Sequence, residues 1–189
     1  MRPSARYAKR FVTLAVAGAI AATTAFGKPA GLRFWSPDIK GPMLGINQVF
    51  NSMGCAGRNV SPELRWSGAP AGTKSFAVTL FDPDAPTGSG WWHWVVYNIP
   101  ATAAGLPSGA GSGRGMPAGA VQGPTDFGTA GFGGACPPKG DKPHRYVFTL
   151  YALKVPKINV PATASPAMIG FNLHANSIAK AMITARYGR

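Results

Sequence analysis

The sequence predicts one mainly β domain, an antiparallel β-sandwich-like fold with a few peripheral helices, one of them near the C-terminus. Its apolar runs are short and rich in β-branched and aromatic residues, which is typical of strands. Gly- and Pro-rich turn segments separate these runs at short intervals, which favours antiparallel sheets over alternating strands and helices. Only one late window shows apolar residues at helical spacing.

The first 27 residues have the three parts of a secretory signal peptide. Four basic residues precede an apolar, Ala-rich run at 11–22, and a small-x-small cleavage signal follows at 25–27. The alternatives are an amphipathic N-terminal helix and an uncleaved anchor, but the apolar run is shorter than the roughly 20 residues that a bilayer span needs. We therefore expect a signal peptide at 1–27 and one domain at 28–189. That domain would be periplasmic or secreted, with no integral membrane span after cleavage.

The chain is strongly basic, with 19 Lys and Arg against 6 Asp and Glu and a net charge of +13. An excess of this size favours anionic partners such as phospholipid headgroups, nucleic acid or acidic polymers. The basic residues are scattered, however, and form no block of about five like charges. This distribution favours a soluble basic protein over one that binds nucleic acid.

The two cysteines, Cys55 and Cys136, predict a disulfide if the protein is exported to an oxidising compartment. In the chain-entropy description, closing so long a loop stabilises a domain by roughly 4 kcal/mol. Two free thiols are the alternative. A CxxC redox motif is absent from the sequence.

Three runs predict the main strands: Ser75–Phe81, Trp94–Ile99 and Arg145–Leu153. In the last of them both alternating faces are mostly apolar, so we expect a central strand that is buried on both sides. Weaker strands are predicted near residues 49 and 65.

A helix is predicted after Ser165, a suitable N-cap, with Pro166 at the first helical position. Apolar residues between Met168 and Ile178 recur near helical spacing. The tail from Lys180 either continues this helix or ends the chain as a strand.

The segment at 101–135 is too long and too rich in glycine for a hairpin. A loop of this length in a compact domain is usually functional or disordered. A low-complexity linker is the alternative, but aromatic residues and Asp126 interrupt the glycines. We therefore favour a functional loop in which glycine lets the backbone approach a ligand.

Acidic residues and histidines gather at the ends of the predicted strands, where sites are usually built. Asp82 and Asp84 follow one strand, and His93 and His144 precede two others. A carboxylate beside tryptophans is costly unless it is paired, and either histidine can pair with it. Imidazoles together with glycine amides suit a phosphoryl group. The alternative roles are turn-forming aspartates and a structural core histidine.

Two stretches, "FDPDAPTGSGWWHWVVYNIP" and "GACPPKGDKPHRYVFTLYAL", resemble the phosphatidylethanolamine-binding protein family, also called Raf kinase inhibitor-like. The chain is most similar to its bacterial YbhB/YbcL-type branch, and the resemblance runs from about residue 33 to the C-terminus. It implies a mainly antiparallel β-fold with peripheral helices. It also implies a small pocket for anionic phosphoryl groups such as phosphoethanolamine.

Matched motif by motif, the resemblance assigns a set of ligand-binding residues: Asp82, Asp84, Pro86, His93, Gly134, Cys136, His144, Arg145 and Tyr146. It also suggests a cis proline at Pro137–Pro138. Two positions depart from the family pattern. Lys142 stands where many relatives have glycine, which adds a rim charge or narrows the mouth. Phe127 replaces a more usual tyrosine and so loses a hydroxyl.

We expect a binding protein for a phospholipid headgroup or another phosphorylated ligand, with no cofactor, no metal and no catalytic residue. His93, His144, Tyr146 and backbone amides would hold the ligand. Asp82 would orient a histidine or accept a bond from the ligand's ammonium group. A protein partner stays open.

The alternatives are an interaction protein that inhibits a kinase or a protease, and an acid–base enzyme that uses an Asp–His pair. The enzyme signal is weak because no nucleophile accompanies the pair. A zinc site is also weak, because HExxH and CxxC spacings are absent.

Overall fold

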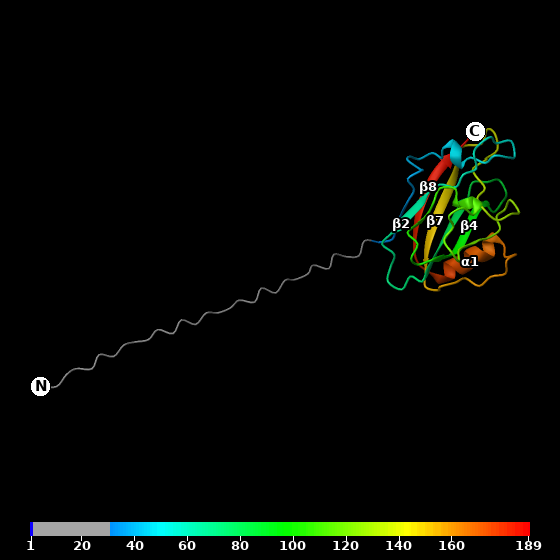
Figure 1. The fold of residues 1–189 in the computed structure, drawn as a ribbon. Helices are drawn as coiled ribbons and strands as arrows, with labels where there is room; N and C mark the ends of the chain where they lie inside the picture. Colours follow the sequence, from blue (N-terminus) through cyan, green and yellow to red (C-terminus); the bar gives the residue numbers. More distant parts are fainter. Residues whose placement is uncertain (2–30) are drawn as a thin grey trace.

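The computed structural model describes Met1 and residues 31–189, so the predicted signal peptide at 1–27 lies, apart from Met1, outside the described residues. Two antiparallel sheets form the body of the molecule (Figure 1). The smaller sheet has the order β1 (Arg33–Trp35), β2 (Leu64–Ser67) and β5 (Gly105–Leu106). The larger has the order β6 (Val121–Gln122), β4 (Trp91–Pro100), β3 (Ser75–Asp82), β7 (His144–Leu153) and β8 (Ser177–Tyr187). The prediction of a mainly β, antiparallel fold is confirmed.

The main core consists of alternate residues of the larger sheet and apolar residues of the smaller one. On β3 and β7 these are Phe76, Val78, Leu80, Phe148 and Leu150, all fully or almost fully buried. Residues two apart on a strand share a face, so each strand directs one row toward the core. Leu64 and Trp66 of β2 belong to the same cluster.

A second apolar cluster lies on the other face of the larger sheet, under helix α1 (Pro166–Asn176). Ile169 and Leu173 of α1 are buried in the same cluster as Ala77, Val95 and Leu153 of the sheet. The strands beneath α1 are therefore buried on both faces. This confirms the prediction of a central strand, now β7, with two apolar faces.

The predicted helix begins as expected but ends earlier. The Oγ of Ser165 accepts a hydrogen bond from the backbone N–H of Met168 at 3.2 Å, and Pro166 is the first helical residue. The helix ends at Asn176, and Ile178 belongs to β8, so the prediction that extended the helical pattern to Ile178 was wrong. The strand prevails there because β8 pairs with β7 along almost its whole length.

The weak strand predicted near residue 65 is confirmed as β2, whereas the one near residue 49 was wrong. A short 3-10 helix, η1 (Ile46–Gln48), occupies that place, and Val49 forms only an isolated bridge with Ala135. The N–H of Gln48 bonds to the carbonyl of Gly45 within this turn. The local turn thus uses a donor that a strand would need.

The Gly-rich segment at 101–135 is not a linker, because it contributes β5, β6 and a second 3-10 helix, η2 (Ala110–Ser112). Its last residues reach the 3-10 turn near Gln48. The N–H of Ala135 donates to the carbonyl of Gln48 at 2.9 Å. A Cβ on Gly134 would lie only 2.5 Å from that carbonyl oxygen. Glycine is therefore required for this close approach.

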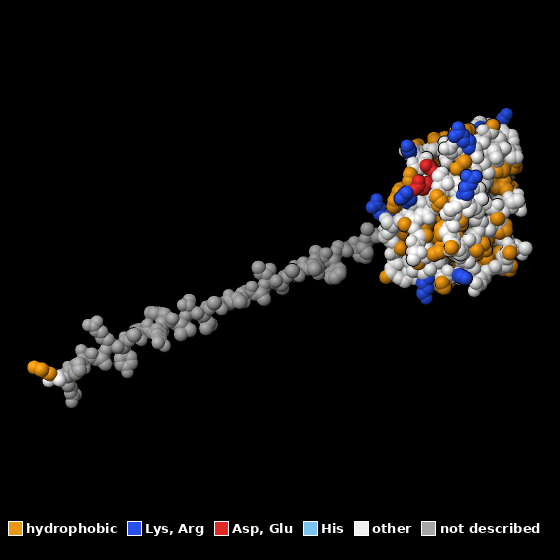
Figure 2. All heavy atoms as spheres, in the orientation of Figure 1, with side chains coloured by type: hydrophobic (Ala, Val, Ile, Leu, Met, Phe, Trp, Pro, Cys, Tyr) orange, Lys and Arg blue, Asp and Glu red, His pale blue; other side chains and the backbone are white. Residues whose placement is uncertain are grey.

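The surface agrees with the scattered charge of the sequence. Figure 2 shows Lys and Arg side chains spaced over the visible face, with acidic side chains gathered at one place among them. Within residues 31–189, no helix combines the length and the apolar character needed to cross a bilayer.

Candidate functional site

A cavity of about 180 Å³ opens where β3 ends and where β4 and β7 begin. β3 and β7 are antiparallel neighbours, with Phe81 opposite Val147, so the end of one strand meets the start of the other. Two sequence-distant segments thereby converge. Six of the sequence-predicted site residues line the cavity: Asp82, Pro86, His93, Cys136, His144 and Tyr146.

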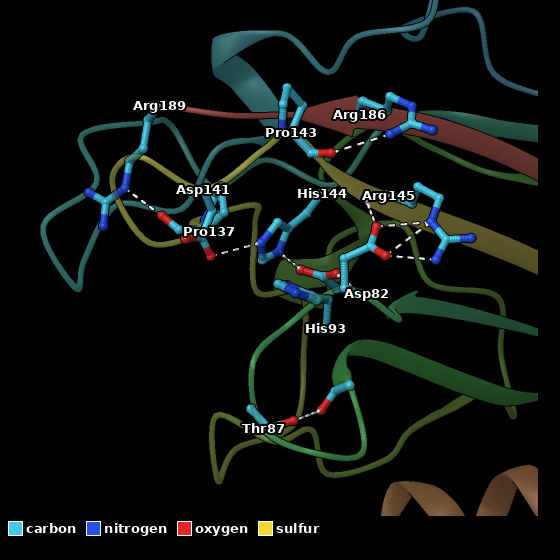
Figure 3. Close-up of polar contacts among 12 residues, drawn as sticks. Asp82, Thr87, His93, Pro137, Asp141, Pro143, His144, Arg145, Arg186 and Arg189 are labelled. Carbon is cyan, nitrogen blue, oxygen red and sulfur yellow. Dashed lines mark hydrogen bonds and ion pairs between the residues drawn. The ribbon is translucent and has the colours of Figure 1, made fainter.

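A buried ion pair forms one wall of the cavity. The Nδ1 of His144 lies 2.8 Å from Oδ2 of Asp82, and its Nε2 lies 3.3 Å from Oδ2 of Asp141 (Figure 3). Burial by itself lowers the pKa of His144, but hydrogen bonds and charge from the two carboxylates outweigh it and raise that pKa. The other oxygen of Asp82 accepts the N–H of Asp84 at 2.9 Å. The Asp82 carboxylate is therefore satisfied by the protein and holds His144 in place.

His93 lies in the same cavity as His144, but its neutral form is favoured, whereas the charged form of His144 is favoured. Its Nδ1 lies 2.9 Å from the carbonyl oxygen of Gly133, so Nδ1 carries a hydrogen and donates. The ring meets those of Tyr146 and Phe127 edge to face, with centroids 5.2 and 5.3 Å away. Burial lowers the pKa of His93, and the hydrogen bond to Gly133 and the charge of Asp82 oppose this shift without reversing it. The ring is therefore neutral near pH 7 and leaves Nε2 as an acceptor.

Two buried hydrogen-bond donors of cavity residues have no partner in the described structure: the hydroxyl of Tyr146 and Nε1–H of Trp91. Buried polar groups without a partner are rare, because each loses its bonds to water. Burial and the nearby charge of Asp82 raise the pKa of Tyr146, so its hydroxyl stays protonated. Both groups are therefore available to donate to a bound molecule.

Asp84 and Arg145 do not line the cavity but pair with each other outside it. The Nη2 of Arg145 lies 2.6 Å from Oδ1 of Asp84, and its Nε lies 2.9 Å from Oδ2. The backbone N–H of Arg145 also donates to Oδ2 at 2.8 Å. Hydrogen bonds from Arg145 lower the pKa of Asp84 to about 2, against the opposing effect of burial. This pair joins the turn after β3 to β7.

Gly134 likewise lies outside the cavity lining, and its N–H donates to Oδ1 of Asn59 at 2.7 Å. The predicted disulfide is confirmed: Cys55 is bonded to Cys136, with their Cα atoms 5.9 Å apart. This bond ties the loop that carries Met53, another lining residue, to the cavity wall. Residues 31–189 contain no cis peptide bond, so the cis proline suggested by the resemblance was wrong.

Four lining residues were missed by sequence reasoning: Met53, Ala85, Thr87 and Trp91. Pro137 and Pro138, noted only for the suggested cis bond, also line the cavity. Trp91 could have been found, because it stands two positions before His93 on β4 and so shares its face. Met53 had no such signal, since only the disulfide and the loop fold bring it to the cavity. Phe127, noted only as a departure, also lines the cavity.

In the part of the chain that the structure covers, no group of three or more His, Cys, Asp or Glu side chains is placed to hold a metal ion. The hydroxyl of Thr87 donates to the carbonyl of Gly90 at 2.6 Å, and Cys136 is oxidised. The arrangement suits binding through hydrogen bonds and charge.

Comparison with known proteins gives a family profile and similar relatives. The family profile described as "Phosphatidylethanolamine-binding protein" matches residues 41–188. YbcL from Escherichia coli K12 is 56% identical over 178 residues, which cover 93% of this chain and 97% of YbcL. YbhB from the same strain is 54% identical over 158 residues, covering 82% and 99% of the two chains.

A solved structure shows the same fold. The crystal structure of Escherichia coli YbcL, described as a new member of the mammalian PEBP family, superposes with a TM-score of 0.82 at 58% identity. The match covers 85% of this chain and 99% of the other. The chain therefore belongs to the phosphatidylethanolamine-binding protein family.

Proposed function

We propose that the cavity binds the phosphoryl group of a phospholipid headgroup or of another phosphorylated ligand, and that the protein acts as a binding protein outside the cytoplasm. One observation carries this proposal. A histidine whose charged form is favoured shares a small cavity with two buried donors that lack partners, in Tyr146 and Trp91. A bound anion would supply the acceptors that those donors need.

The roles of the individual residues follow from their contacts. His144 would contribute positive charge, and Asp82 would act as a positioning residue for its ring rather than as a direct ligand contact. Neutral His93 would accept a hydrogen bond from a protonated ligand oxygen through Nε2.

Two features support a periplasmic or secreted location. The Cys55–Cys136 disulfide is typical of proteins from oxidising compartments. The first 27 residues have the composition of a signal peptide. Mass spectrometry of the protein from the periplasmic fraction would test this: a mature N-terminus near residue 28 supports export, and an intact Met1 in the cytoplasm contradicts it.

Phosphoethanolamine titration tests the binding proposal. At a concentration about 100 times Kd, a ligand stabilises the folded state by about 2.7 kcal/mol, which raises Tm by about 5–10 °C for a domain of this size. His144→Ala should abolish the shift. His174→Ala is the matched control, because His174 lies in the last turn of α1 and does not line the cavity.

Since His144→Ala leaves Asp82 buried without its partner and can unfold the domain, Tyr146→Phe serves as a second variant. It removes only a hydroxyl without a partner and should still weaken phosphoethanolamine binding by about tenfold. If wild type binds neither phosphoethanolamine nor any other phosphoryl compound, the proposed function is wrong.

A further inference from the structure

A second hollow of about 540 Å³ lies beside the cavity and shares His144 with it. We call it the basic groove, after its charged and titratable lining residues: Asp84, Asp141, Lys142, His144, Arg145 and Arg186. The imidazole of His144 stands between the two spaces. It bonds Asp82 of the cavity through Nδ1 and Asp141 of the groove through Nε2 (Figure 3).

Strand pairing places two cations of the groove at opposed positions. Arg145 on β7 and Arg186 on β8 are directly opposite in the antiparallel register, and both are exposed. Like charges at directly opposed positions destabilise a sheet. Asp84 compensates Arg145 through a two-pronged pair. No acidic side chain in residues 31–189 pairs with Arg186. Its guanidinium makes one hydrogen bond there, from Nη1 to the carbonyl oxygen of Pro143 at 3.3 Å.

The acids of the groove are already occupied. Both oxygens of Asp84 accept hydrogen bonds from Arg145, and Asp141 contacts His144. The exposed ammonium of Lys142 has no ion pair or hydrogen bond within the described residues. A guanidinium presents five N–H donors, so Arg186 retains most of its capacity. The groove therefore contains cationic donors without partners among the described residues. They lie at a strand pairing that would be more stable with fewer positive charges.

We propose that the basic groove binds a second anionic group of the ligand, a carboxylate or a phosphate, while the cavity holds the phosphoryl group on the other side of His144. This inference rests on the proposed function. It identifies the preferred ligands as phosphorylated molecules with two anionic groups, such as phosphoserine, either free or as a lipid headgroup. Phosphoethanolamine, which lacks the carboxylate, would leave Lys142 and Arg186 without a partner.

Calorimetric titration of the full mature chain with O-phosphoserine and with phosphoethanolamine tests the inference. We expect wild type to bind phosphoserine about tenfold more tightly, as two partly exposed charge contacts allow. The double variant Lys142→Gln/Arg186→Gln should bind both compounds equally and keep the wild-type affinity for phosphoethanolamine. The control Lys154→Gln/Lys157→Gln alters two cations outside the groove and should keep the tenfold preference.

Equal affinities in wild type, or a preference that survives in the double variant, would overturn the groove site and leave the phosphoryl cavity intact. If neither phosphoserine nor phosphoethanolamine binds, the proposed function is overturned instead. Vesicles that contain phosphatidylserine separate the two sources: binding to them as well as to free phosphoserine identifies a lipid headgroup, and binding to the free compound alone identifies a soluble acid.

A stability measurement checks the repulsion independently of any ligand. Arg186→Gln removes one of two opposed cations and should raise the Tm of the ligand-free protein, more at low salt than at high salt. A lower Tm in both conditions would show that Arg186 serves the fold, and would remove the reason to expect an anion there.

Discussion

Tyr146 carries a buried hydroxyl that makes no hydrogen bond with the described residues, and this has a measurable energetic consequence. Tyr146→Phe should raise the free energy of unfolding by about 1 kcal/mol, because it removes a polar group that was desolvated without compensation. Urea unfolding of the ligand-free protein measures this. Tyr187→Phe, at a partly exposed position, should have little effect. A clear loss of stability in Tyr146→Phe would mean that the hydroxyl has a partner in solution.

Asp84 gives a pH-dependent prediction at the same scale. Its pKa is lowered to about 2 from an ordinary value of 3.8, so its contribution to stability is present above pH 3.8 and is lost as pH falls through about 2. The pair with Arg145 is partly exposed, so Asp84→Asn should cost less than about 1 kcal/mol at pH 7. In urea unfolding, that difference from wild type should shrink as pH falls from about 3.8 toward 2 and vanish only below pH 2. A difference that stays constant down to pH 2 would contradict the assignment.

The two motifs contain much of the cavity lining, but the sequence did not show which of their residues lie together. Asp82, His93, His144 and Tyr146 line one cavity, whereas Arg145 faces away from it. Alternation along β7 explains this, since His144 and Tyr146 share a face and the residue between them points to the other. The resemblance identified these residues, and the strand geometry shows that Tyr146 lines the cavity, Arg145 lines the groove and His144 lies between them.

At the scale of elements, the loop that ends the Gly-rich segment depends on close backbone contact. Gly134→Ala would place a Cβ 2.5 Å from the carbonyl oxygen of Gln48 and 2.6 Å from the backbone nitrogen of Phe50. We expect a loss of about 1–3 kcal/mol, because one of the two segments must shift. Thermal and urea unfolding measure it. Gly41→Ala is the control, since its Cβ would meet nothing within 4 Å; an equal loss in both variants would contradict the contact argument.

Strongly patterned elements could be predicted, and short ones could not. The strands β3, β4 and β7 could be predicted because each is a long run of mostly apolar residues. The runs are apolar because these strands are buried along most of their length. The failure near Val49 has a local cause, a 3-10 turn that uses donors which a strand would need. The failure at Ile178 has a distant cause. Pairing with β7 outweighs a helical pattern that sequence alone can extend past Asn176.

For the whole molecule, the Cys55–Cys136 bond joins segments 81 positions apart and forms part of the cavity wall. The double variant Cys55→Ser/Cys136→Ser should lose roughly 4 kcal/mol of stability, which corresponds to a Tm lower by about 8–16 °C. Calorimetry measures the change. A reducing agent should lower the Tm of wild type and leave the variant unaffected. An unchanged Tm in the variant would show that packing alone holds the loop.

The sequence by itself determined the fold class, the family and the supply of chemical groups. Periodicity, turn residues and two motifs are local properties of the chain, and they can be read without knowing which segments meet. The tertiary structure alone decided that Asp82 pairs with His144, that Met53 and Trp91 join the cavity, and that Arg145 stands opposite Arg186. These contacts depend on strand register and on loops brought together across long separations, because side chains distant in the chain become neighbours only when the sheets have paired.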